Sequence, residues 1–341
     1  MLGIERALST INGKKTDRPS VLPSIDVAYA PECAGLKVGE CFKDTSLHAN
    51  ALMGALEKYP GTDGLYVNLC LESSMLKEEN GLYDDGYGLG WYVPEDDIGT
   101  VKKHSITELS GKLMDEDTSL KYGIINTFSK IDSYYKEKYL ILPGITGPYS
   151  QVVFMLGLEN VLMLMYDEPE ELKAAIEKRV IYSVNWLKEL VALGAKGVWL
   201  GEGAASSSVI SPAAYKEFVA PYAKAVVEEA KALGIPCFMH VCGDIRPEIN
   251  EILSTGCMQM DVDHMVPLED IRDSAEDNVC LKGNIDPVFL LNASEQAVFN
   301  KAKEIIDSQN KPFILGTGCL VAKGTPKVNI DALVRASESY M

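Results

Sequence analysis

Residues 211–244 read SPAAYKEFVAPYAKAVVEEAKALGIPCFMHVCGD, and this stretch contains the structural unit from which we predict the fold. Its first part has apolar residues at helical spacing, with Pro212 in the first turn, and predicts a helix over Ser211–Leu233. The short apolar run Pro236–Val241 follows and predicts a strand. Alternation of helices with buried strands is typical of a parallel β-sheet.

The same alternation recurs along the chain. Eight apolar runs have the length of a strand: Val21–Val27, Gly64–Leu69, Leu140–Ile145, Gly197–Gly201, Pro236–Val241, Met258–Val262, Val279–Lys282 and Phe313–Thr317. Two more helices are predicted, one over Pro169–Leu193 with Asp167 as candidate N-cap, and one over Ser294–Ser308. Eight strands, each followed by a crossover, favour a closed barrel over an open doubly wound sheet. We therefore expect a single (β/α)8 TIM barrel domain over residues 1–341.

Residues Glu78–Lys102 interrupt this rhythm between the second and third predicted strands. They contain five glycines and four large aromatic residues, which predict an inserted hairpin or lid over the barrel mouth. Its glycines do not form a dinucleotide-binding fingerprint, because no strand leads into them and their spacing differs. Aromatic side chains of the insertion, Tyr83, Tyr87 and Trp91, are candidate substrate contacts.

Composition narrows the class of protein. The 341 residues include 49 acidic and 32 basic side chains, for a formal charge of −17, which disfavours nucleic acid and anionic membrane surfaces as partners. The N-terminal sequence lacks a signal-peptide core, so a cytoplasmic protein is expected. Eight cysteines in such a chain are expected to be thiols or metal ligands rather than disulfides.

Three residues predict a metal site. His240 and Cys242 lie two positions apart at the end of a predicted strand, so their side chains point to the same side. Cys319 follows the eighth predicted strand, and the carboxyl ends of barrel strands converge on the active site. An H-x-C pair alone is a weak motif, but one imidazole with two thiolates suits a zinc ion that keeps a fourth position open.

Glu202 also follows a predicted strand and has two readings. It is either a fourth zinc ligand or a catalytic general base and hydrogen-bonding group beside the metal. Four further polar residues at strand ends, Asp26, Asp263, His264 and Asn284, are candidate substrate contacts. For Asp26 a helix cap, and for His264 an ordinary surface position, remain open.

Longer motifs carry a family resemblance. HVCGD at 240–244, GNIDP at 283–287 and ILGTGCLVAKGTPKVNIDALVRA at 314–336 resemble the uroporphyrinogen decarboxylase superfamily, and within it the zinc-dependent methyltransferases of corrinoid systems. LGEGAASSSVISPAAYKEFVAPY at 200–222 resembles the family's segment after the fourth strand. The resemblance implies His240, Cys242 and Cys319 as zinc ligands in a (β/α)8 barrel.

The resemblance implies methyl transfer involving the corrinoid of a separate carrier protein. The N-terminal half is most similar to methyltransferase components of O-demethylase systems, so an aryl methyl ether is the expected methyl donor and cob(I)amide the acceptor. A methylcobamide:thiol methyltransferase of the coenzyme M type is the alternative. A homodimer is compatible with either.

Two other functions stay open. Uroporphyrinogen decarboxylases carry an N-terminal arginine segment that binds the carboxylates of the tetrapyrrole, and the single early Arg18 does not resemble it. An acidic mouth would also repel such a substrate, which disfavours decarboxylation. A barrel that binds a corrinoid or tetrapyrrole without turnover is the remaining reading, and metal content separates it from the zinc enzyme.

Overall fold

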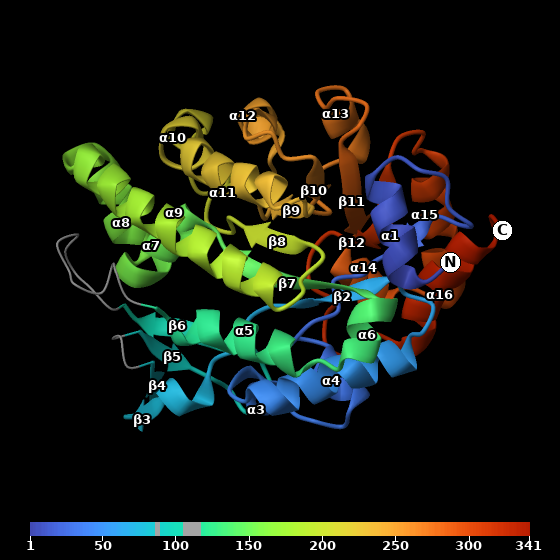
Figure 1. The fold of residues 1–341 in the computed structure, drawn as a ribbon, viewed down its shortest axis with the longest axis horizontal. Helices are drawn as coiled ribbons and strands as arrows, with labels where there is room; N and C mark the ends of the chain where they lie inside the picture. Colours follow the sequence, from blue (N-terminus) through green and yellow to red (C-terminus); the bar gives the residue numbers. More distant parts are fainter. Residues whose placement is uncertain (86–88, 105–116) are drawn as a thin grey trace.

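Parallel strands follow one another around a barrel in the computed structural model, which describes residues 1–85, 89–104 and 117–341 (Figure 1). The strands pair in the order β1, β12, β11, β10, β9, β8, β7, β2, and every ladder is parallel. Their bounds are Ser20–Val21 (β1), Gly64–Val67 (β2), Leu140–Thr146 (β7), Val198–Gly201 (β8), Cys237–His240 (β9), Gln259–Asp261 (β10), Cys280–Ile285 (β11) and Phe313–Thr317 (β12). Each strand lies within or overlaps one predicted run, and the predicted (β/α)8 barrel is confirmed.

The barrel closes between β1 and β2 through single hydrogen bonds instead of a ladder. Asp63 N donates to Val21 O at 2.7 Å, and Tyr66 N donates to Ile25 O at 3.1 Å. The first predicted strand was too long, because regular pairing ends at Val21. Pro23 follows shortly after, and its nitrogen has no hydrogen to donate to a neighbouring strand.

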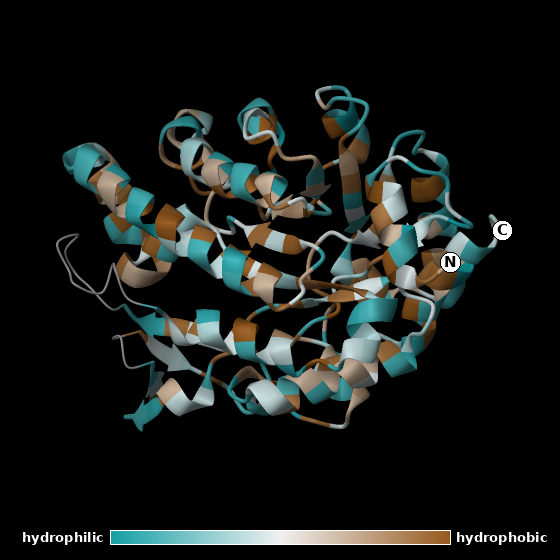
Figure 2. Ribbon diagram, viewed as in Figure 1, coloured by the Kyte–Doolittle hydropathy of each residue, from teal (hydrophilic) through white to brown (hydrophobic). Residues whose placement is uncertain are grey.

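Helices surround the strands, and Figure 2 shows hydrophobic colour on the strands and alternating colours along the helices. Such alternation is typical of helices that pack one face on the protein interior and expose the other to water. The helices are α1 Gly3–Ile11, α2 Ala30–Cys33, α3 Val38–Phe42, α4 Thr45–Lys58, α5 Ser119–Lys130, α6 Ser133–Lys138, α7 Pro148–Leu156, α8 Leu158–Asp167, α9 Pro169–Ala192, α10 Pro212–Phe218, α11 Ala220–Ala232, α12 Ile249–Ser254, α13 Leu268–Arg272, α14 Pro287–Asn292, α15 Glu295–Asp307 and α16 Lys327–Glu338, with short 3-10 turns at Ser73–Met75 and Arg246–Glu248.

Two helix predictions need correction. The predicted helix Ser211–Leu233 is divided at Val219 into α10 and α11, because Pro221 cannot donate the backbone hydrogen bond that a continuous helix requires. Asp167 is not the N-cap of α9: it is the last residue of α8, and Glu168 occupies the cap position without a side-chain capping hydrogen bond to the helix.

The insertion after β2 forms a small antiparallel sheet beside the barrel. Its strands are β3 Lys77–Glu79, β4 Leu82–Asp84, β5 Gly90–Tyr92 and β6 Thr100–Lys103, paired in chain order. Trp91 of β5 turns inward, is 2% exposed and packs against Phe42 and Phe154. The insertion is therefore joined to the barrel by an aromatic contact.

The connection from β7 to β8 carries α7, α8 and α9, and the first two of these helices meet at Gly157. Gly157 has a φ of 85°, a conformation that glycine adopts without strain, and the helix axes differ by 109°. Among the described residues no single helix is long and apolar enough to cross a membrane, and only this bent pair passes on length and composition when its two helices are taken together.

Candidate metal centre and cavity

Three soft donor groups meet at the carboxyl end of the barrel. His240 is the last residue of β9, Cys242 lies two residues later, and Cys319 lies two residues after the end of β12. The ligand atoms of His240, Cys242 and Cys319 all lie within 4.8 Å of one another. In the described part of the chain this is the one group of three or more such residues close enough to share a metal ion. The structure thus brings the three predicted ligands together.

The His240 ring is held in a defined orientation. Its Nδ1 lies 2.9 Å from the main-chain oxygen of Asp261, and its Nε2 lies 3.1 Å from Cys242 Sγ. A hydrogen bond to a carbonyl places the proton on Nδ1 and leaves the Nε2 lone pair available for a metal. The indole of Trp199 stacks on the ring, with centroids 5.3 Å apart and an interplanar angle of 29°.

The two thiols of the cluster differ in acidity. A hydrogen bond from Cys242 lowers the pKa of Cys319, and burial opposes this shift. The same contact with Cys319, together with burial, raises the pKa of Cys242. A bound cation would favour the thiolate form of both cysteines and release their protons.

This donor set fits zinc. One neutral imidazole and two thiolates match the three protein ligands of catalytic zinc sites, in which a fourth position stays open. Five other cysteines are buried away from the cluster, and burial raises the pKa of each: Cys41, Cys70, Cys237, Cys257 and Cys280. They behave as packed thiols rather than ligands.

Glu202 lies close to the cluster but outside it. Its carboxylate faces the first turn of α7, where it accepts bonds from Ser150 N at 2.9 Å, Ser150 Oγ at 2.7 Å and Tyr149 N at 3.3 Å. Burial raises the pKa of Glu202 to about 7, and these bonds oppose that rise. The geometry matches an acidic group at a helix N-terminus. Among the described residues, Glu202 does not join the metal-ligand group.

A cavity of about 390 Å³ opens beside the cluster. Its wall is mostly apolar, and its lining residues come from several strand ends and from α7: Ser24, Tyr66, Asn68, Leu69, Thr146, Ser150, Val153, Phe154, Trp199, Gly201, Gly203, Ala204, His240, Cys242, Asp261, Cys319 and Leu320. The sequence analysis named three of these residues as site residues. Aromatic strand residues such as Tyr66 and Trp199 were missed, because a strand pattern does not tell which aromatic side chains face the barrel interior.

The four polar residues expected to contact substrate lie behind or beside this cavity. Asp26 is fully buried, with Oδ1 3.3 Å from His48 Nε2, and it accepts a bond from the Asn68 main chain at 3.2 Å. Asp263 braces the loop after β9 by accepting a bond from Gly243 N at 2.9 Å. Neither belongs to the described lining of the cavity.

His264 and Asn284 line a separate, more polar groove. His264 Nδ1 lies 2.9 Å from Asp263 Oδ1, and Asn284 Nδ2 donates to Val266 O at 2.7 Å.

The described aromatic residues of the insertion do not line the cavity. Tyr83 receives a hydrogen bond from Lys43 and, like Trp91, lies outside the cavity lining. Trp91 contacts Phe154, which is a lining residue of the cavity. Tyr87 lies outside the described residues.

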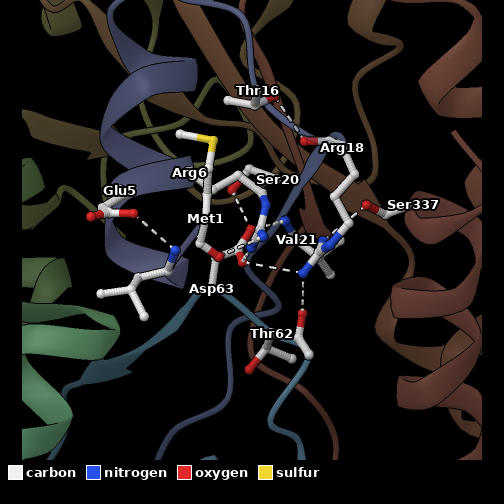
Figure 3. A network of polar contacts seen from close by, with 12 residues as sticks. Met1, Glu5, Arg6, Thr16, Arg18, Ser20, Val21, Thr62, Asp63 and Ser337 are labelled. Carbon is white, nitrogen blue, oxygen red and sulfur yellow. Dashed lines mark hydrogen bonds and ion pairs between the residues drawn. The ribbon is translucent and has the colours of Figure 1, made fainter. Parts of the chain in front are cut away.

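Arg18 lies at the opposite end of the barrel. It forms an ion pair with Asp63, which immediately precedes β2, and donates to Ser337 Oγ at 2.9 Å (Figure 3). Arg6 pairs with the same carboxylate, and Ser20 Oγ donates to it at 2.7 Å. Arg18 therefore ties the amino-terminal ends of strands together and does not face the cavity.

Comparison with known proteins places this barrel in a family. A family model described as uroporphyrinogen decarboxylase (URO-D) matches residues 2–340. The chain belongs to the uroporphyrinogen decarboxylase family. Within that family it is 30% identical over 224 residues to the methylated-thiol–coenzyme M methyltransferase of Methanosarcina mazei, covering 65% of this chain and 59% of that relative. The predicted family resemblance is confirmed.

Other members of the uroporphyrinogen decarboxylase family are also similar. A methylcobamide:CoM methyltransferase of Methanosarcina mazei is 25% identical over 246 residues, or 71% of each chain. A uroporphyrinogen decarboxylase of Trichodesmium erythraeum is 25% identical over 211 residues, covering 60% of this chain and 59% of the relative. A solved structure of a methyltransferase from Methanosarcina mazei superposes with a TM-score of 0.83 at 18% identity, covering 100% of this chain and 99% of the other, which supports the shared fold.

Proposed function

We propose that this protein is a zinc-dependent methyltransferase that moves a methyl group from an aryl methyl ether to the reduced corrinoid of a separate carrier protein. The observation that carries the proposal is the His240, Cys242 and Cys319 cluster, which opens into a mostly apolar cavity. Two of the similar family members are named as methyltransferases that act on coenzyme M. The cluster and these relatives together favour methyl transfer over decarboxylation.

The residues of the cluster would have separate roles in holding the metal ion. His240 Nε2 and the sulfur atoms of Cys242 and Cys319 would hold zinc, and the Asp261 carbonyl keeps the imidazole turned toward it. When bound, zinc supplies a Lewis acid that stabilises negative charge on the leaving oxygen. Transfer would break the methyl C–O bond of the ether with its electron pair on oxygen, and the methyl group would pass to the reduced corrinoid of the carrier protein as the acceptor substrate.

The cavity favours a neutral substrate. The side chains of Tyr66, Phe154 and Trp199 give it aromatic walls, and among the described lining residues there is no lysine or arginine. Coenzyme M carries a sulfonate, which would need a cation or several donors to leave water. The cavity wall instead includes the carboxylate of Asp261, whose charge is already paired with Lys282. A small aryl methyl ether could pack against these aromatic side chains without bringing a charge into the cavity.

The volume of the cavity supports a corrinoid that is carried by a separate protein. A cavity of about 390 Å³ has room for a small aromatic molecule, whereas a corrinoid ring system is several times larger. The corrinoid would therefore approach the open mouth from outside, on another protein. The alternative, methylation of a thiol held by the same zinc, is favoured by the activities named for the relatives.

Metal analysis with paired assays tests the proposal. We expect about one zinc per chain in the purified protein, loss of that zinc in Cys319→Ser, and retention in the control variant Cys237→Ala, whose thiol is buried outside the cluster. The protein should demethylate a neutral aryl methyl ether in the presence of cob(I)alamin. Methylation of coenzyme M from methylcobalamin without ether turnover would favour the alternative, and absence of bound zinc from active protein would contradict both.

A further inference from the structure

An ion pair lies buried at the cavity wall, where Asp261 is a lining residue and Lys282 lies behind it, outside the described lining. Lys282 Nζ is 2.8 Å from Asp261 Oδ1, and Lys282 is 0% and Asp261 5% exposed. The ammonium group also donates to Ser24 Oγ at 2.6 Å and to Thr317 O at 2.8 Å. These partners come from β10, β12 and the segment after β1. The lysine is thus fully engaged within the barrel and is not a free cation for a ligand.

The second oxygen of Asp261 is held by two aromatic side chains. Trp199 Nε1 donates to Asp261 Oδ2 at 3.1 Å, and the Tyr66 hydroxyl donates to the same oxygen at 3.3 Å. The two rings also meet edge to face, with centroids 6.4 Å apart. The carboxylate therefore fixes the direction in which the Trp199 indole lies.

Asp261 reaches the metal-site histidine by two routes. Its main-chain oxygen accepts the His240 Nδ1 hydrogen bond at 2.9 Å. Its carboxylate holds Trp199, whose indole stacks on the His240 ring with centroids 5.3 Å apart. The register agrees, since Asp261 of β10 pairs with His240 on one side and with Lys282 on the other.

Two glycines make room for this arrangement. A Cβ atom on Gly201 would lie 2.4 Å from atoms of the Trp199 six-membered ring. A Cβ atom on Gly316 would lie 2.4 Å from Lys282 Cε and 2.6 Å from a main-chain oxygen. Both contacts are far shorter than van der Waals separation, so any larger residue would displace the indole or the lysine stem.

Burial of an ion pair gives little net stability, because the loss of water around both charges offsets their attraction. Instead, the pair of Asp261 and Lys282 fixes the positions of the side chains around the His240 ring. We infer that Asp261, Lys282 and Trp199 are positioning residues that set the orientation of His240 toward the metal. The inference rests on the proposed zinc site, because its consequence is the geometry of the ion bound there.

Cobalt(II) substitution gives a readout that does not depend on methyl transfer. Trp199→Phe keeps a ring for stacking but removes the Nε1 hydrogen bond to Asp261. Tyr66→Phe is the matched control, because it removes a bond to the same oxygen from a ring for which no stacking on His240 is seen. We expect Trp199→Phe to weaken cobalt binding about 10- to 100-fold and to shift the visible d–d bands, and Tyr66→Phe to leave the spectrum unchanged.

A second variant protects the test against a folding defect. Gly201→Ala leaves the indole chemically intact and displaces it, so it should change the cobalt spectrum as Trp199→Phe does, with circular dichroism confirming that each variant is folded. Wild-type spectra and affinity in both folded variants would overturn the inference while leaving the proposed function standing. Failure of the wild-type protein to bind cobalt or zinc would overturn the proposed function itself.

Discussion

Each end of the barrel buries a carboxylate with basic partners, and the two carboxylates are surrounded differently. Asp63, at the amino-terminal end, is fully buried and paired with Arg6 and Arg18. Asp261, at the carboxyl end, is paired with Lys282 and lines the cavity. Two arginines bind Asp63, and we call these three residues the lower cluster. One lysine and two aromatic side chains bind Asp261, and we call Asp261 and Lys282 the upper pair.

The remaining partners explain the difference. Arg18 continues to Ser337 of α16 and to the Gly61 carbonyl at 2.7 Å, so the lower cluster joins segments that are distant in sequence. Asp261 leads instead to His240, through its carbonyl and through Trp199. The lower cluster is suited to holding the chain together and the upper pair to orienting a reactive group. Substitutions at the two ends should therefore differ in their effect on the metal more than in their effect on stability.

The largest effect is expected for Lys282→Met. This change leaves the Asp261 carboxylate buried without its cation, which should lower the free energy of unfolding by about 3–5 kcal/mol. Because Lys282 fixes the carboxylate that holds Trp199, its loss should loosen the position of the indole, and metal binding should weaken about 10- to 100-fold. Urea denaturation and titration with a competing chelator measure the two quantities. An unchanged metal affinity in the folded variant would show that the upper pair, like the lower cluster, contributes to stability alone.

Asp63→Asn should affect stability alone. It leaves two buried arginines without their shared carboxylate, although Arg6 keeps its 2.6 Å contact with Asp17, so a loss of about 3 kcal/mol is expected. Zinc content and chelator affinity should match the wild-type protein, as measured on samples below the onset of unfolding. A weaker metal site in this variant would show that the ends of the barrel are coupled and would remove the contrast drawn between them.

The smallest effect concerns the exposed edge of the lower cluster. The hydrogen bond from Arg6 lowers the pKa of Asp17 below its ordinary value of 3.8, so this contribution to stability is present above that pH and is lost as the pH falls through the lowered pKa. Asp17→Asn should cost about 1 kcal/mol near neutral pH, since the side chain is partly exposed. The difference from wild type should shrink below about pH 4. A constant difference across that range in denaturation experiments would argue against the ion pair as its source.

The sequence predicted the metal site at the carboxyl end of the barrel better than it predicted the lower cluster. Strand ends in a parallel barrel meet at one mouth, so His240, Cys242 and Cys319 could be placed near one another from their positions alone. Glu202 shares that position in the pattern, yet its side chain faces α7, because the backbone N–H groups of the first turn attract a carboxylate. Strand position therefore predicts proximity, and side-chain direction depends on which donors lie nearby.

The interior of the barrel was predicted least well. Lys282 ended a predicted apolar strand, and a charged residue there is a signal of a buried partner, but the pattern does not name Asp261 as that partner. Trp199 was counted only as an apolar strand residue. Its contact with Asp261 crosses 62 positions of sequence and exists only because the intervening strand brings the two side chains together.

By itself the sequence determined the eight strands, the barrel and the three soft donors at its mouth, because apolar periodicity and strand order are local properties of the chain. Only the tertiary structure decided which oxygen holds the His240 ring, where the Glu202 carboxylate points and which carboxylate the buried Lys282 neutralises. Those choices depend on contacts between strands far apart in the chain, where burial makes an unpaired polar group costly and its partner is fixed by geometry.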